Sequence, residues 1–79
     1  MVHEPGARVS TSAGNGTVRF IGNTEFAPGV WVGVELDSQT GKNDGSVAGK
    51  YYFESKAGFG LFVRPTQIRD APVVSIFLF

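Results

Sequence analysis

The most regular pattern of apolar and polar positions in the chain lies in residues 31–36. Val32, Val34 and Leu36 occupy every second position there, so they share one face of an extended strand. Trp31 lies on the opposite face. Because alternation of this length is typical of a half-buried strand, we predict that the three aliphatic residues belong to the core and that Trp31 faces away from it.

Short runs of this kind recur along the chain, and turn-forming residues separate them. In a run before Gly22, the alternation places Val18 and Phe20 on one face. Residues 13–16 are predicted to form a turn, and residues 54–58 a single helical turn. The predicted strands cover residues 8–10, 17–21, 31–36, 46–47, 51–53 and 61–64.

So many short strands in 79 residues predict an all-β domain: a small, SH3-like, strongly bent antiparallel β-barrel with long loops. A chain of this length forms one domain. Eleven glycines and four prolines argue against a long helix. The chain has no cysteine, so no disulfide or thiolate zinc site can stabilise it. Stability must come from the apolar core, whose last predicted member is Ile68.

Charge and hydropathy exclude several classes of partner. Seven basic and seven acidic side chains give a formal net charge of zero, which argues against binding to nucleic acid. The longest apolar run, residues 73–79, is far too short to cross a membrane as a helix. Residues 1–20 contain no apolar run typical of a signal peptide. We therefore expect a soluble intracellular domain with no nucleic-acid or membrane partner.

The sequence offers little catalytic or metal-binding chemistry. A serine triad would need His3, the only histidine, close to the N-terminus. A phosphate-binding interpretation of residues 41–42 needs a glycine where Leu36 stands. A calcium-loop interpretation of residues 43–45 fails because Lys42 stands at a ligand position. We expect no enzyme activity, no cofactor and no metal.

Aromatic residues that cannot all be core suggest a binding surface instead. Trp31 faces away from the predicted core, and Phe26 lies in a loop. Residues 51–53 are all aromatic, and neighbours in a strand face opposite ways, so some of these rings are exposed. Phe59 and Phe62 add two more. Such rings either cap the open ends of a barrel or line a groove, and contiguous exposed apolar surface favours the groove.

A polar loop between two glycines completes the candidate site. Gly41 and Gly45 let the backbone turn sharply and expose its N–H groups. Lys42 carries an ammonium group, and Asn43 offers a donor and an acceptor. Asp44 is predicted to hydrogen-bond the backbone of its own loop. The alternative is a solvated turn. Aromatic walls beside N–H groups and a lysine suit an aromatic side chain joined to carboxylates.

The run 41–53 resembles the defining motif of CAP-Gly domains, the cytoskeleton-associated glycine-rich modules. Residues 6–9, 16–18, 31–37 and 60–64 resemble the flanking blocks of this family, in order. Five ordered blocks are far more specific than one short motif. The chain is most similar to the modules of the large dynactin subunit and the cytoplasmic linker proteins.

The resemblance divides the chain into an N-terminal extension (1–5), a CAP-Gly domain (6–69) and a C-terminal tail (70–79). It implies a module that binds the Glu-Glu-Tyr/Phe tails of α-tubulin, end-binding proteins and cytoplasmic linker proteins. The implied location is the cytoplasm, on microtubules and their plus ends. We expect the isolated domain to be monomeric.

The resemblance also implies the roles of individual residues. Lys42 and Asn43 are expected to hold the acidic groups and the terminal carboxylate of the ligand. Gln67 is expected to add a polar contact. The rings expected to line the groove are those of Phe26, Trp31 and Phe62.

Two features depart from the family pattern. Phe59 stands between two glycines where family members often have histidine, which makes this rim more apolar. The tail 70–79 has no counterpart, and it ends in Phe79 with a free carboxylate. We therefore hypothesise weak entry of Phe79 into the groove of a neighbouring molecule. An SH3-like module for proline-rich peptides is the alternative function. A small RNA-binding barrel that stacks bases on its aromatic rings is a third class, and zero net charge and scattered Lys and Arg argue against it.

Overall fold

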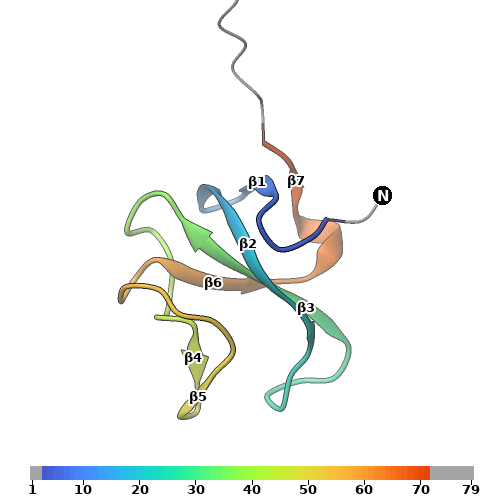
Figure 1. Ribbon diagram of the computed structural model, residues 1–79, viewed down its shortest axis with the longest axis vertical. Helices are drawn as coiled ribbons and strands as arrows, with labels where there is room; N and C mark the ends of the chain where they lie inside the picture. The colour runs from blue at the N-terminus through green and yellow to red at the C-terminus, as the bar shows by residue number, and fades with distance from the viewer. Residues whose placement is uncertain (1–2, 72–79) are drawn as a thin grey trace, which may run out of the picture.

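A computed structural model describes residues 3–71 of the chain. Five strands form an antiparallel sheet in the order β6-β3-β2-β1-β7, and β4 pairs with β5 in a separate hairpin (Figure 1). The elements are β1 (Arg8–Thr11), β2 (Gly14–Asn23), β3 (Val30–Leu36), β4 (Ser46–Val47), β5 (Lys50–Tyr51), β6 (Gly60–Val63), the 3-10 helix η1 (Pro65–Gln67) and β7 (Arg69–Asp70). The predicted all-β, antiparallel fold is confirmed. Most of the predicted tail, including Phe79, lies outside the described residues.

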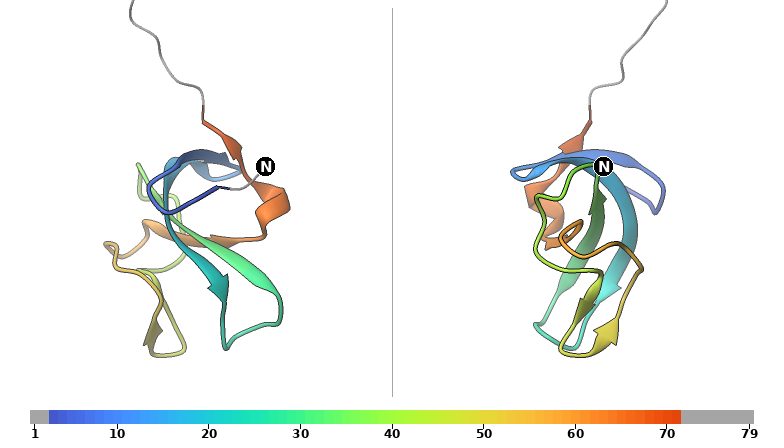
Figure 2. Two further views of the ribbon diagram at one scale, coloured as in Figure 1. Left: turned by 45° about the vertical axis from the view of Figure 1, so that its right-hand side comes forward. Right: turned by 90° about the vertical axis from the view of Figure 1, so that its left-hand side faces the viewer.

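The long strands β2 and β3 form the centre of the sheet, and β6 extends it beside β3. Both long strands bend, so the sheet curls around the core (Figure 2). The β4–β5 hairpin and the β2–β3 loop lie together at one end of the molecule, and β1 and β7 lie at the other end (Figures 1 and 2). Within residues 3–71, no helix is long and apolar enough to span a membrane.

The core consists of aliphatic side chains from one face of the sheet. The predicted core face of β3 is confirmed, because Val32, Val34 and Leu36 are all buried. Ile68, after η1, is also buried as predicted. The cluster contains Val9, Val18, Val32, Val34, Leu36, Leu61, Val63 and Ile68.

A β-bulge in β2 makes one prediction about side-chain facing wrong. Val18 pairs with Val34, and Phe20 pairs with Gly33, so the register shifts by one residue between them. An extra residue of this kind sends every later side chain to the opposite face. Val18 is therefore buried in the core, whereas Phe20 lies on the outer face. Ile21 packs against the core in its place.

The turn predicted at residues 13–16 is displaced toward the N-terminus, because Ser12 and Ala13 form it and Gly14–Gly16 belong to β2. A Cβ on Gly16 would come within 2.5 Å of the carbonyl oxygen of Glu35. This glycine therefore permits close approach of β2 and β3, where the sequence suggested a turn. Residues 54–58 form no helical turn in the structure.

The strand predicted at residues 51–53 ends early, at Tyr51. The backbone N–H of Tyr52 still donates to the carbonyl of Gly45 at 2.9 Å, in register with the hairpin. The N–H of Gly45 donates instead to the Oδ1 of Asn43 at 2.9 Å, so the hairpin ladder ends at this point. Ala48 and Gly49 form the predicted turn of this hairpin, with φ values of 52° and 85°. Two consecutive positive φ angles are typical of the type I′ turn that joins paired strands.

The packing of the core predicts that two valines of β3 contribute differently to the free energy of unfolding. Val34 is fully buried, and Val30 is 43% exposed. Val34→Ala removes two buried methyl groups and leaves a cavity, so it is expected to lower the free energy of unfolding by about 2 kcal/mol. Val30→Ala is the matched control and is expected to cost less than about 0.5 kcal/mol. Urea unfolding measures both, and equal losses would contradict this packing.

Candidate functional site

Six aromatic side chains pack together on the outer face of the sheet, and we call them the aromatic cluster. Phe62 touches four of the other rings, with centroid distances from 5.1 Å to Phe26 up to 6.3 Å to Phe20. Most pairs meet edge to face, as aromatic rings prefer. Every ring in the cluster is only half-buried. The cluster contains Phe20, Phe26, Trp31, Tyr52, Phe53 and Phe62.

The cluster exists because β3 has no side chain at Gly33. This residue pairs with Phe20 of β2 on one side and Phe62 of β6 on the other. A Cβ on Gly33 would lie 2.5 Å from the nearest ring atom of Phe53. The Phe53 ring therefore packs directly on the backbone of β3, between rings from two neighbouring strands.

The β2–β3 loop, residues 24–29, carries Phe26 and is tied to the cluster by three side chains. The hydroxyl of Tyr52 accepts a hydrogen bond from a loop N–H at 2.9 Å. The indole N–H of Trp31 and the guanidinium of Arg64 donate to loop carbonyls at 3.3 and 2.8 Å. Arg64 also stacks 3.8 Å above the Trp31 ring. These contacts hold Phe26 against Trp31 with a centroid distance of 5.3 Å.

The glycine-framed loop lies directly beside β6. The N–H of Lys42 donates to the carbonyl of Gly60 at 2.8 Å, and the N–H of Gly60 donates to the carbonyl of Asn43, also at 2.8 Å. The N–H of Gly41 donates to the carbonyl of Gly58 at 2.7 Å. A Cβ on Gly41 would come within 2.5 Å of the Gly60 carbonyl oxygen. The glycines thus let the loop pack backbone against backbone, next to the strand that carries Phe62.

Side chains inside the loop fix its shape. The Asn43 Oδ1 accepts a hydrogen bond from the N–H of Gly45 at 2.9 Å. Gly45 has φ +92°, which favours glycine. The Asp44 carboxylate accepts from the N–H of Ser46 at 3.0 Å, from the Ser46 hydroxyl, and from the Tyr51 hydroxyl at 2.9 Å. The hydroxyl bond from Ser46 is the largest cause that lowers the pKa of Asp44, followed by the backbone bond and by Tyr51.

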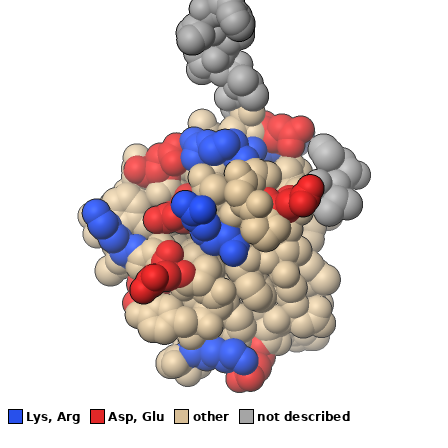
Figure 3. Space-filling view, in the orientation of Figure 1, with Lys and Arg blue, Asp and Glu red and all other residues tan. Residues whose placement is uncertain are grey.

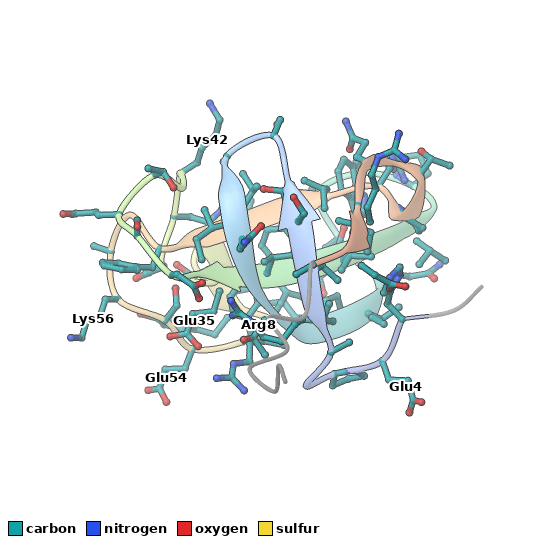
Figure 4. All side chains as sticks on the ribbon, turned by 90° about the horizontal axis from the view of Figure 1, so that it is seen from above. Glu4, Arg8, Glu35, Lys42, Glu54 and Lys56 are labelled. Carbon is teal, nitrogen blue, oxygen red and sulfur yellow. The ribbon has the colours of Figure 1, made fainter. Side chains whose placement is uncertain are left out.

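Lys42 is the exposed cation of this loop. Figure 4 shows its side chain extending away from the sheet, whereas Lys56 points to a different side. Within residues 3–71, Lys42 forms no ion pair, whereas Lys50 pairs with Glu25 at 2.8 Å. Elsewhere acidic and basic side chains are interspersed (Figure 3). Lys42 therefore presents a positive charge that its own neighbours do not neutralise.

The structure brings most of the sequence-predicted site residues together. Phe26, Trp31 and Phe62 meet in the cluster, and Lys42 and Asn43 lie beside β6. The carbonyl oxygen of the Gln67 side chain accepts a hydrogen bond from the N–H of Arg64 at 2.6 Å, so it caps η1.

The sequence pattern predicts Phe20 on the core face, and it includes residues 51–53 among the possible groove rings without singling out Tyr52 or Phe53. The β-bulge moves Phe20 to the outer face, and no local sequence pattern predicts this bulge. For Tyr52 and Phe53, the glycine at position 33 was the available signal, because a bare position in a strand often marks close approach of another group. Phe59, which was considered for the rim, is half-buried and stacks on none of the six rings.

A separate hollow of about 450 Å³ lies on the other face of β3. Its lining includes Val30 and Val32, and a contact of 2.6 Å between His3 and Asp70 lies at its polar side. Among the described residues, no three His, Cys, Asp or Glu side chains gather in a way that could hold a metal ion. The aromatic cluster and the glycine-framed loop remain the candidate site.

Fold and site together define a small all-β interaction module, in which an aromatic surface lies beside a lysine-bearing loop. The family model of the CAP-Gly domain matches residues 5–68. The chain therefore belongs to the CAP-Gly domain family.

Curated relatives include cytoskeletal motor, chaperone and dynactin proteins. Kinesin-like protein KIF13B of Homo sapiens is 55% identical over 71% of this chain and 3% of that protein. Tubulin-folding cofactor B of Mus musculus is 57% identical over 67% of this chain and 22% of that protein. Dynactin subunit 1 of Drosophila melanogaster is 52% identical over 81% of this chain and 5% of that protein. The chain thus spans only a small part of each of these relatives.

Two solved structures share the fold. The CAP-Gly domain of human Kinesin-like protein KIF13B superposes with a TM-score of 0.84 at 46% identity, covering 90% of this chain and 72% of that one. The Bik1 CAP-Gly domain, solved with an ETF peptide from Bim1, gives a TM-score of 0.72 at 33% identity and covers 78% of this chain and 77% of that one.

The hydrogen bonds inside the loop predict its response to pH. Because the pKa of Asp44 in the folded state lies below its ordinary value of 3.8, its stabilising effect is present above about pH 4. That effect is lost as the pH falls through the folded pKa. Ser46→Ala removes the hydroxyl hydrogen bond that contributes most to the lowered pKa of Asp44. This substitution is therefore expected to move the pKa of Asp44 back toward 3.8.

Titration of the Asp44 carboxyl carbon by NMR measures this pKa. Tyr51→Phe is the comparison variant and is expected to raise the pKa less than Ser46→Ala, because the bond from Tyr51 is a smaller cause. A wild-type pKa at or above 3.8 would show that the carboxylate does not hold the loop in this way.

Proposed function

We propose that this domain binds acidic, aromatic-ended C-terminal tails of the Glu-Glu-Tyr/Phe type. The observation that carries the proposal is the position of the exposed Lys42 loop beside β6, the strand whose Phe62 is the most connected ring of the aromatic cluster. A C-terminal aromatic residue presents a ring and a carboxylate only a few bonds apart. The site offers a complementary cation and a complementary aromatic surface, carried by a loop and a strand that are hydrogen-bonded to each other.

The aromatic half of the ligand finds a surface of half-buried rings. Phe26, Trp31 and Phe62 form one continuous series, with centroid distances of 5.3 Å for Phe26 to Trp31 and 5.1 Å for Phe26 to Phe62. A further ring that covers their exposed edges loses apolar contact with water and gains edge-to-face contacts. Tyr52 packs edge to face against two rings of this series, at 5.7 Å from Phe26 and 5.5 Å from Phe62.

The acidic half of the ligand finds the loop. Lys42 supplies the ammonium group, and charge-assisted hydrogen bonds to a carboxylate are roughly twice as strong as neutral ones. Asn43 uses its Oδ1 within the loop, which fixes the amide plane and leaves its Nδ2 to donate to the ligand. The Gln67 amide is the third polar contact that we assign to the ligand.

The relatives support the choice of partners. One neighbour in fold is a CAP-Gly domain solved with a peptide, and the relatives include a tubulin-folding cofactor and a dynactin subunit. On this basis the partners are the C-terminal tail of α-tubulin, end-binding proteins and cytoplasmic linker proteins. The domain then acts on cytoplasmic microtubules and their plus ends, as one part of a longer protein.

An SH3-like module for proline-rich peptides remains the second candidate, because an aromatic surface also suits such ligands. A proline-rich ligand has no need of a terminal carboxylate or of Lys42. Dependence on the free carboxylate therefore separates the two functions.

The direct test titrates the domain with a peptide that ends in Glu-Glu-Tyr and with the same peptide amidated at its C-terminus. We expect micromolar binding of the free acid, because small interfaces of this kind give moderate affinity, and a large loss on amidation. Isothermal titration calorimetry measures both. Equal binding of the two peptides would exclude a carboxylate-binding mechanism.

Substitution of the loop residues tests their roles. Lys42→Ala is expected to cost roughly 1–3 kcal/mol of binding free energy with little change in melting temperature, because the side chain is exposed. Lys56→Ala is the matched control, since it removes the same charge from a different side of the domain (Figure 4). Asn43→Ala is expected to weaken binding and also to lower the melting temperature, because Asn43 accepts a bond inside the loop.

A further inference from the structure

A second lysine, Lys50, borders the aromatic cluster, and it forms an ion pair with a carboxylate of the same chain. The Lys50 ammonium lies 2.8 Å from the Glu25 carboxylate. Lys50 belongs to the β4–β5 hairpin, and Glu25 belongs to the β2–β3 loop. The ion pair therefore connects two segments that lie at the same end of the molecule (Figure 2).

Lys50 is in position to reach a ligand on the cluster. Its ammonium lies 5.4 Å from the centroid of the Tyr52 ring, within the range of a cation–π contact. Tyr52 in turn lies 5.7 Å from Phe26 and 5.5 Å from Phe62. One ring thus separates Lys50 from the rings that we assign to the aromatic end of the ligand.

The contact with Glu25 is easily exchanged. The side chains of Lys50 and Glu25 are 51% and 74% exposed. Ion pairs this exposed contribute little to stability, because water and salt screen them. A carboxylate brought by a ligand can therefore replace the carboxylate of Glu25 at small cost, since one exposed carboxylate substitutes for another.

The loop does not need this ion pair to keep its place. The backbone N–H of Glu25 donates to the Tyr52 hydroxyl at 2.9 Å, and this bond does not involve the carboxylate. Arg64 and Trp31 hold the same loop through further hydrogen bonds. The carboxylate of Glu25 can leave Lys50 while Phe26 remains in the cluster.

We propose that Lys50 is a second carboxylate-binding cation of the peptide site, and that Glu25 is an internal competitor that an acidic ligand displaces. The proposal rests on the peptide-binding function above and adds a determinant of specificity to it. Lys42 binds the terminal carboxylate at the glycine-framed loop. Lys50, on the hairpin, then binds a glutamate side chain that precedes the aromatic end, so the domain distinguishes acidic tails from other aromatic-ended tails.

The other ion pairs of the described residues do not share this position. Arg19 pairs with Glu35 at 2.9 Å, and Arg8 pairs with Asp37 at 2.6 Å. Neither arginine stacks on a ring of the cluster, whereas Lys50 does. The Arg19–Glu35 pair is therefore a suitable control, because neutralising Glu35 changes the net charge by the same amount as neutralising Glu25.

The test measures dissociation constants by calorimetry at low salt for wild type, Glu25→Gln and Glu35→Gln. The ligands are peptides that end in Glu-Glu-Tyr and Gln-Gln-Tyr. Glu25→Gln is expected to bind the glutamate peptide about 2–5-fold more tightly than wild type does, as the free energy of an exposed ion pair implies. The gain is expected to vanish with the glutamine peptide, and Glu35→Gln is expected to change little.

Lys50→Gln shows whether the effect passes through Lys50. In that background, adding Glu25→Gln is expected to give a clearly smaller gain than in the wild type. An equal gain would mean that Glu25 merely repels the ligand, and it would overturn the proposal. Equal effects of Glu25→Gln and Glu35→Gln would overturn it as well, because they would reflect net charge alone.

One measurement needs no variant. Addition of the glutamate peptide to wild-type protein is expected to shift the NMR signals of the Glu25 carboxyl carbon and the Lys50 ammonium, and unchanged signals in the bound state would contradict displacement. If wild type binds neither peptide, the proposed function itself fails. If wild type binds and the Glu25 and Lys50 results are negative, only the present inference fails.

Discussion

Gly33 lies in the middle of β3, where a Cβ would come within 2.5 Å of the Phe53 ring. The ring can pack there only because the backbone is bare, and it brings the chain after the hairpin across the outer face of the sheet. Phe62 then meets Phe53 at 5.4 Å, and Tyr52, the residue before Phe53, meets both Phe20 and Phe26. One missing side chain thus allows rings from five segments of the chain to form one surface.

Because of this arrangement, one face of β3 packs into the core and the other face supports the aromatic cluster. Val32 and Val34 point into an aliphatic core that is fully or almost fully buried. A domain of this size buries a modest share of its surface, so it has little apolar area to spare for stability. The aromatic cluster is half-buried, so it adds to stability while its exposed edges remain open to a ligand. Folding and recognition therefore use the same rings, which limits how freely these residues can be replaced.

The sequence predicted those parts of the fold in which apolar and polar residues alternate along a strand without interruption. The core face of β3 follows from strict alternation, and Ile68 follows from its place after a polar segment. Phe20 could not be placed, because a bulge is defined by pairing with β3 and leaves no local mark. Tyr52 and Phe53 are predicted to continue a strand because of their β propensity, yet the N–H of Gly45 donates to the Asn43 side chain and not to Tyr52, so the hairpin ladder ends there. Pairing between strands overrides the local pattern in the first case, and a side-chain hydrogen bond within the loop overrides it in the second.

The charges explain how a domain of zero net charge can suit an acidic ligand. Three of the seven basic side chains form ion pairs within residues 3–71, in the Arg8–Asp37, Arg19–Glu35 and Lys50–Glu25 pairs. Salt screens the remaining charges with a Debye length of about 8 Å under physiological conditions, so their electrostatic attraction acts only at short range. In the proposed function, attraction of an acidic tail depends on Lys42 and on Lys50, the cation whose internal partner can exchange. At such short range, the cations of the proposed site attract only a ligand that already contacts the aromatic cluster. Binding then requires an aromatic ring and a carboxylate in the same ligand, and this double requirement gives the specificity.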